Sequence, residues 1–176
     1  MFVDNSLCFG LCQTAKIGNL YETVEFYVIK GDFDLLQDLI DEATSLEINL
    51  TRNYTYNEFD SMTEGVVINM PVIINGNGFV IDAKGKSRIF NITSDNVIIK
   101  NITFRNAKAD NGSAVYFNGN GTVTNCNFNN NIAEALAGAI YFAGGSTGEV
   151  LNCNFTNNSA YSGGAIYFAG GSTGIS

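Results

Sequence analysis

The stretch Ala137–Gly148, AGAIYFAGGSTG, recurs 26 residues later at Gly163–Gly174 as GGAIYFAGGSTG. A weaker copy, GSAVYFNGNG, occupies residues 112–121, and the related segments VTNCNFNNN and VLNCNFTNN lie at 123–131 and 150–158. A more degenerate relative, VIIKNITFRN, comes before them. The chain is therefore built from imperfect repeats of about 25 residues, and this period is the main indicator of its fold.

Each repeat contains short apolar runs separated by clusters of Asn and Gly. Runs of this length indicate strands, the clusters indicate turns, and no helical period is present. A unit of 24–27 residues holds three short strands and three turns, which make one rung of a parallel solenoid; a propeller blade needs about 40 residues. One rung cannot bury its inner face alone, so rungs must stack. The sequence predicts an all-β fold, a right-handed parallel β-helix.

Aligning the repeats on Asn101, Asn125 and Asn152 produces columns of like residues. The Ile/Cys and Phe columns alternate with polar residues along each strand, so they should point inward, with like residues ~4.8 Å apart between rungs. We expect Asn side chains at the bends to exchange hydrogen bonds along the stack. The predicted structural columns are Asn101/Asn125/Asn152, Asn106/Asn130/Asn157, Ile102/Cys126/Cys153 and Phe104/Phe128/Phe155.

Two of the four cysteines, Cys126 and Cys153, share the column of Ile102. We expect buried free thiols that behave as small apolar residues. A disulfide between adjacent rungs is the alternative, because the Cα spacing permits it, although parallel Cβ vectors suit its torsion poorly. The redox state of Cys8 and Cys12 stays open. The cysteines form no CxxC pair and the chain has no His, so neither a metal site nor a cofactor is expected.

The segment before the repeats contains a helix candidate. Asp32 is suited to the N-cap and Asp34 to the first turn, and an apolar stripe follows. We expect a capping helix within residues 31–46 that covers the open end of the solenoid. The stripe consists of Leu35, Leu36, Leu39, Ile40 and Ala43.

The remaining boundaries follow from how regular the repeats are. Residues 47–96 read as irregular early rungs, and residues 97–176 as regular repeats that are truncated at the C-terminus. Residues 1–30 stay unassigned, although Val24–Ile29 has the composition of a strand. Because the chain stops just after a unit ends, we expect a fragment whose last rung frays or associates end to end with another copy.

Charge and composition restrict the partners. The chain has 176 residues and a net charge of −8, with 17 acids against 9 bases. This balance disfavours nucleic acid and anionic lipid, both of which require a basic surface. No run of about 18 apolar residues is present, so no membrane insertion is expected. The N-terminus also lacks a recognisable signal peptide.

The repeats resemble a known family. Units such as NCNFTNNSAYSGGAIYF are similar to the GGAI and FxxN repeats of polymorphic outer-membrane proteins and, more closely, to adhesin-like surface proteins of methanogenic archaea. The likeness covers roughly residues 31–176. It implies a pectin-lyase-type β-helix, export, an extracellular or cell-surface location, and adhesion to surface glycans or proteins of other cells. The motifs that carry it are Phe128/Asn131, Phe155/Asn158, Gly163–Ile166 and Ala137–Ile140.

Enzymes that cut acidic glycans are the alternative, because lyases and hydrolases also occur on this fold. Such enzymes need clustered carboxylates, for Ca²⁺ or for acid–base chemistry. The acids after Ser87 fall at different points of their repeats, and Asp82 with Lys84 and Lys86 reads as turn chemistry. We therefore expect no enzymatic activity. The dispersed acids are Asp95, Asp110, Glu134 and Glu149.

Eight Asn-x-Ser/Thr sequons occur in the chain. In an exported protein they are potential glycosylation sites, although a chain rich in Asn, Thr and Ser also produces sequons by chance. Sequons inside the predicted Asn columns would be poor acceptors. The candidates at positions expected to be exposed are Asn49, Asn53, Asn111 and Asn120.

Overall fold

The computed structural model describes residues 14–17, 20–23 and 31–175. The chain divides into two compact units, residues 1–30 and 31–176. In the first unit, β1 (Thr14–Ile17) pairs antiparallel with β2 (Leu20–Thr23). The predicted strand at Val24–Ile29 lies outside the described residues, as do Cys8 and Cys12.

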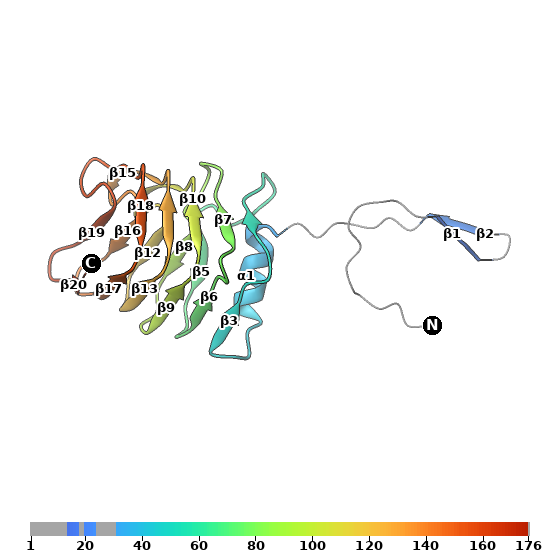
Figure 1. Cartoon of the computed structure of the whole chain (residues 1–176), viewed down its shortest axis with the longest axis horizontal. Helices are drawn as coiled ribbons and strands as arrows, with labels where there is room; N and C mark the ends of the chain where they lie inside the picture. The colour runs from blue at the N-terminus through green and yellow to red at the C-terminus, as the bar shows by residue number, and fades with distance from the viewer. Residues whose placement is uncertain (1–13, 18–19, 24–30, 176) are drawn as a thin grey trace. The chain divides into compact units, whose positions relative to one another are not determined.

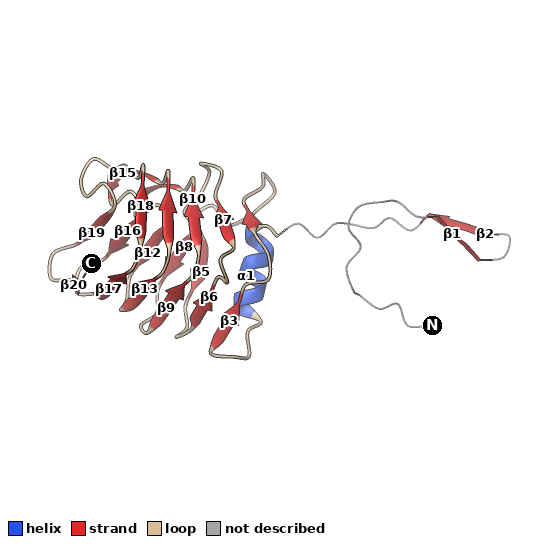
Figure 2. Cartoon of the chain, in the orientation of Figure 1, coloured by secondary structure: helices blue, strands red, loops and turns tan. Residues whose placement is uncertain are grey.

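The second unit is an all-β parallel solenoid, which confirms the predicted fold class (Figures 1 and 2). Most of its strands form three long parallel sheets along the axis, and β11 (Lys108–Asn111) and β15 (Ile132–Leu136) form a short fourth one. The five strands of sheets 2 and 3 give five turns. Sheet 1 consists of β3 (Glu47–Asn49), β6 (Ile73–Asn75), β9 (Val97–Lys100), β13 (Gly121–Thr124), β17 (Thr147–Leu151) and β20 (Thr173–Ile175). Sheet 2 consists of β4 (Tyr54–Thr55), β7 (Val80–Asp82), β10 (Thr103–Arg105), β14 (Asn127–Asn129) and β18 (Asn154–Thr156). Sheet 3 consists of β5 (Val66–Ile68), β8 (Phe90–Ile92), β12 (Val115–Phe117), β16 (Ile140–Phe142) and β19 (Ile166–Phe168).

Like residues stack directly on one another inside the solenoid. The register pairs Phe104 with Phe128 and Phe128 with Phe155, as the sequence alignment predicts. Their ring centroids lie 4.9 and 5.0 Å apart, close to the strand-pairing distance. A second column, which the alignment had not singled out, stacks Phe117, Phe142 and Phe168 at 4.7 and 4.8 Å. These two columns form much of the core.

The bends between strands are made by residues with left-handed backbone. Among the described residues, eight of the ten non-glycine positions with positive φ are Asn. Asn adopts this conformation more readily than other non-glycine residues. All six members of the two predicted Asn columns belong to this group: Asn101, Asn106, Asn125, Asn130, Asn152 and Asn157.

The predicted side-chain ladder along these Asn columns is realised only in part. Asn101 donates to Asn75 Oδ1 at 3.0 Å, and Asn106 donates to Asp82 Oδ1 at 2.9 Å. Within the described part of the chain, the other four members make no side-chain hydrogen bond. The common property of the columns is therefore the left-handed bend, which the repeat alignment does not predict.

Helix α1 (Phe33–Asp41) lies at the start of the stack (Figure 1). Asp32 is its N-cap and accepts from Leu35 N–H at 2.9 Å, as predicted. The helix is shorter than residues 31–46, because Glu42 forms its C-cap. It buries Phe33, Leu36 and Ile40, of which Phe33 was missing from the predicted stripe. The helix packs against β4 and β5 and so covers the first rung.

The side chain of Gln37 closes the free edge of sheet 3. Its Oε1 accepts from Val67 N–H at 2.7 Å, and its Nε2 donates to the Val67 carbonyl at 3.1 Å. Val67 is the middle residue of β5, the first strand of that sheet. The amide thus makes the pair of hydrogen bonds that a neighbouring strand would otherwise supply, which blocks pairing with another chain at this edge.

We expect Gln37→Ala to lower the free energy of unfolding by about 1–3 kcal/mol, because two backbone groups of β5 lose their partner. Chemical denaturation followed by circular dichroism measures the change. Asp38→Ala is the matched control, because Asp38 is exposed on the same helix. Equal stability of the two variants would show that the amide does not hold this edge.

Candidate functional site

A surface that carries both basic and amide side chains lies where the strands of sheet 2 end. A groove of about 380 Å³ runs along the bends that follow β7, β10 and β14. Part of one wall comes from β11 (Lys108–Asn111) and β15 (Ile132–Leu136), which pair in parallel with Lys108 opposite Ile132. We call it the basic groove, and its lining residues are Lys84, Gly85, Asn106, Ala107, Lys108, Asn130 and Ile132.

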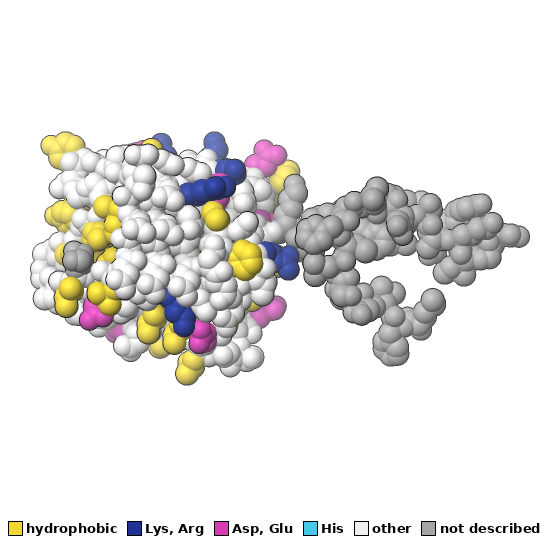
Figure 3. Space-filling view, viewed as in Figure 1, with side chains coloured by type: hydrophobic (Ala, Val, Ile, Leu, Met, Phe, Trp, Pro, Cys, Tyr) yellow, Lys and Arg dark blue, Asp and Glu magenta, His cyan; other side chains and the backbone are white. Residues whose placement is uncertain are grey.

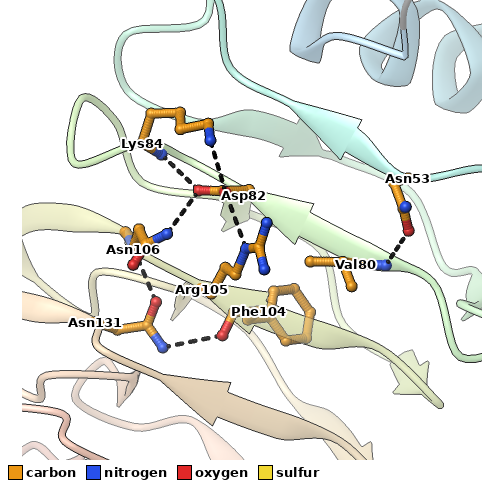
Figure 4. A network of polar contacts seen from close by, with 9 residues as sticks. Asn53, Val80, Asp82, Lys84, Phe104, Arg105, Asn106 and Asn131 are labelled. Carbon is orange, nitrogen blue, oxygen red and sulfur yellow. Dashed lines mark hydrogen bonds and ion pairs between the residues drawn. The ribbon is translucent and has the colours of Figure 1, made fainter.

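A buried carboxylate organises the residues beside the basic groove (Figure 4). Asp82, at the end of β7, is 1% exposed. Its Oδ1 accepts from the Lys84 N–H and from Asn106 Nδ2, both at 2.9 Å. Its Oδ2 accepts from Arg105 Nε at 2.9 Å and lies 3.3 Å from Lys84 Nζ. The predicted turn chemistry of Asp82 with Lys84 is thus present, and Arg105 and Asn106 of the next rung join it.

These contacts favour the negatively charged form of the Asp82 carboxyl group. Burial alone would raise the pKa of its carboxyl, but the hydrogen bonds from Asn106, Lys84 and Arg105 outweigh burial and lower the pKa below 3.8. A carboxylate with a lowered pKa is a poor proton acceptor at neutral pH. Asp82 therefore serves to hold two cationic side chains rather than to exchange protons.

At the neighbouring bend, the side chain of Asn131 makes the hydrogen bonds between rungs that backbone groups make elsewhere. It is fully buried, accepts from Ala107 N–H at 3.0 Å and donates to the Phe104 carbonyl at 3.3 Å (Figure 4). Asn158 repeats this geometry one rung later, on Asn131 N–H and the Phe128 carbonyl. The last residue of each FxxN motif is therefore the one that bonds along the stack. The repeat alignment predicts the ladder one residue earlier in each motif, at Asn130 and Asn157.

A second groove lies at the opposite end of the sheet 2 strands. It has a volume of about 340 Å³ and is lined mainly by amide side chains. Its lining residues are Asn77, Gly78, Asn101, Ile102, Thr103, Asn125 and Asn127.

The remaining predicted residues are dispersed over the solenoid. Asp95 accepts from Asn120 N–H at 2.8 Å, and Glu134 pairs with Lys108 at 3.6 Å. Asp110 and Glu149 are exposed on β11 and β17. No three His, Cys, Asp or Glu side chains of the described residues are close enough to hold a metal ion.

The candidate sequons differ in exposure. Asn49, Asn53 and Asn120 are exposed, whereas Asn111 is half-buried. In each of the four the side-chain Oδ1 accepts a hydrogen bond from the next rung. The donors are Asn75 to Asn49, Val80 to Asn53, Leu136 to Asn111 and Thr147 to Asn120.

The thiols of Cys126 and Cys153 are free and lie in adjacent rungs, one residue before the paired Asn127 and Asn154. A hydrogen bond from Cys126 lowers the pKa of Cys153 to about 7. The same contact and burial raise the pKa of Cys126. Cys126 is buried and Cys153 half-buried, so the two thiols differ in both access and acidity.

No family model, curated protein or solved structure matches the chain. Among the described residues, no helix has the length and apolar character required to cross a membrane.

We expect acid to destabilise the solenoid through Asp82. Because the folded pKa lies below the unfolded value, the contribution of Asp82 is present above about pH 4 and is lost as pH falls through the folded pKa. Asp82→Asn should lower the free energy of unfolding by about 1–3 kcal/mol at pH 7 and flatten its dependence on pH below 4. Urea unfolding at pH 7 and pH 3 measures both effects. Asp110→Asn is the control, and a similar loss in that variant would contradict the role of Asp82.

We expect Cys153 to react with a maleimide faster than Cys126 at pH 7, because it is more exposed and has the larger thiolate fraction. A Cys8→Ser/Cys12→Ser background removes the other thiols, and peptide mass mapping of timed samples gives the two rates. Faster labelling of Cys126, or a native disulfide between the two, would be inconsistent with this geometry.

Proposed function

We propose that this chain is a non-catalytic β-helix segment that serves in adhesion or structural display at a cell surface. The proposal rests on which side chains the solenoid exposes and which it buries. The outer surface of the regular rungs is built largely from Asn, Thr and Gly, whereas the carboxylate beside the basic groove is buried and hydrogen-bonded. The buried carboxylate of Asp82 thus serves the fold, and the repeated polar surface is available for binding.

The resemblance to adhesin-like surface proteins of methanogenic archaea supports the same proposal. The FxxN and GGAI motifs that carry the resemblance have structural roles. Asn131 and Asn158 bond along the stack, and Ile140 pairs with Ile166 in sheet 3. Further rungs of the same kind, or surface glycans and proteins of other cells, are the partners that this function implies.

A lyase or hydrolase acting on acidic glycans is the second candidate, and it is favoured by the bases around the basic groove. A lyase needs a group that accepts a proton, and a hydrolase needs two or three carboxylates facing one groove. Asp82 is buried and fully bonded, and among the described residues neither groove is lined by Asp or Glu. The grooves therefore do not offer the free carboxylates that these reactions need, so we rank catalysis second.

We expect no turnover of polygalacturonate or alginate, with or without Ca²⁺, in assays for reducing ends and unsaturated products. Beads coated with the folded chain should bind a glycan array more strongly than beads coated with the urea-unfolded chain. Reproducible turnover that is lost in one of Asp82→Asn, Asp95→Asn, Asp110→Asn, Glu134→Gln or Glu149→Gln would replace the proposal with the enzymatic alternative. Equal glycan binding by beads coated with the folded chain and beads coated with the unfolded chain would contradict the adhesive part of the proposal.

A further inference from the structure

Basic residues gather at one place on an acidic chain. Four of the nine Lys and Arg residues lie at the bends along the basic groove: Lys84 and Lys108 line the groove, and Lys86 and Arg105 are next in sequence to the lining residues Gly85 and Asn106. Figure 3 shows dark blue side chains above β7 and β10. The acids of the same bends and of the β11–β15 wall are fewer: Asp82, Asp110 and Glu134. The groove is thus a local surplus of positive charge on a chain of net charge −8.

The basic side chains are held in place and remain about half exposed. Asp82 binds Arg105 through Nε, and within the described part of the chain both Nη groups of Arg105 have no protein partner. The side chains of Lys84, Arg105 and Lys108 are each about half exposed, at 54, 47 and 53%. The pair of Lys108 with Glu134, at 3.6 Å between exposed groups, is weak and readily exchanged.

The other groups of the groove favour a sugar over a peptide or a nucleic acid. Asn106 and Asn130 offer amide groups, which donate to and accept from hydroxyls. Ile132, 48% exposed, adds a small apolar wall of the kind that contacts a sugar ring. As lined by the described residues, the groove has no large apolar or aromatic pocket of the kind that anchors protein partners, and no aromatic platform for bases.

We propose that the basic groove binds the carboxylate groups of an acidic, uronate-containing polysaccharide. The half-exposed guanidinium of Arg105 and the ammonium groups of Lys84 and Lys108 pair with the carboxylates, while Asn106 and Asn130 bind neighbouring hydroxyls. The inference rests on the proposed adhesive function and names the ligand class for one of its surfaces. Asp82 acts as a positioning residue, because it holds Arg105 and Lys84 without contacting the ligand.

Calorimetric titration of the whole chain with oligogalacturonates at low ionic strength tests the proposal. Binding should weaken as salt rises. Lys108→Gln should weaken it about fivefold, because one charge-assisted contact is lost. Lys108→Gln leaves the Asp82 network intact. Lys100→Gln is the matched control, because Lys100 pairs with Glu47 at 3.0 Å on sheet 1 and its loss changes the net charge equally. Its affinity should stay within twofold of the unmodified chain.

The outcomes separate this inference from the proposed function. Oligogalacturonate should bind more tightly than dextran, dextran sulfate or poly-glutamate. Equal or tighter binding of dextran sulfate or poly-glutamate, equal weakening by Lys100→Gln, or no binding at all would each overturn the carboxylate-polysaccharide site. Release of products, which chromatography of the titrated oligosaccharides detects in the same samples, would instead contradict the proposed non-catalytic function.

Discussion

The strand-pairing distance between rungs constrains everything else in this molecule. Parallel strands lie about 4.8 Å apart, so every inward side chain meets the side chain at the same place in the next rung. The stacked Phe pairs obey this spacing, with ring centroids 4.7 to 5.0 Å apart and nearly parallel planes. A residue that suits one rung therefore suits the next, and this is the physical reason for the near-identical repeats.

The same constraint explains why so many Asn residues occupy the turns. A short strand must bend sharply to reach the next sheet, and a left-handed residue at the bend interrupts the backbone ladder. Asn130 supplies such a bend, at φ 55°, and the adjacent Asn131 turns its side chain inward to bond the backbone of the previous rung. Neighbouring Asn residues thus have different roles, one conformational and one as a substitute for backbone hydrogen bonds.

These two roles mark the limit of what the sequence can predict. Strand positions, the Phe104/Phe128/Phe155 column and the helical cap follow from periodicity and from the Asp32 signal, because those are local or repeated features. A left-handed Asn and a hydrogen-bonding Asn look alike in a sequence, so the repeat alignment places the ladder on Asn130 and Asn157 rather than on the adjacent Asn131 and Asn158. The contact of Gln37 with Val67, 30 residues away, and that of Arg105 with Asp82, 23 residues away, have no local signature.

The basic groove shows where a repeat protein can acquire an individual function. Along sheet 2, the register places Asp82, Arg105, Asn129 and Thr156 at equivalent positions of successive rungs. The later rungs therefore carry neutral side chains where the earlier rungs carry an ion pair. Lys108 is likewise followed in register by Ile132 and Ser159. An identical charge in every rung would place like charges about 4.8 Å apart, which is destabilising. A charged site on such a solenoid must therefore lie where the repeat is broken, as it is at Asp82, Arg105 and Lys108.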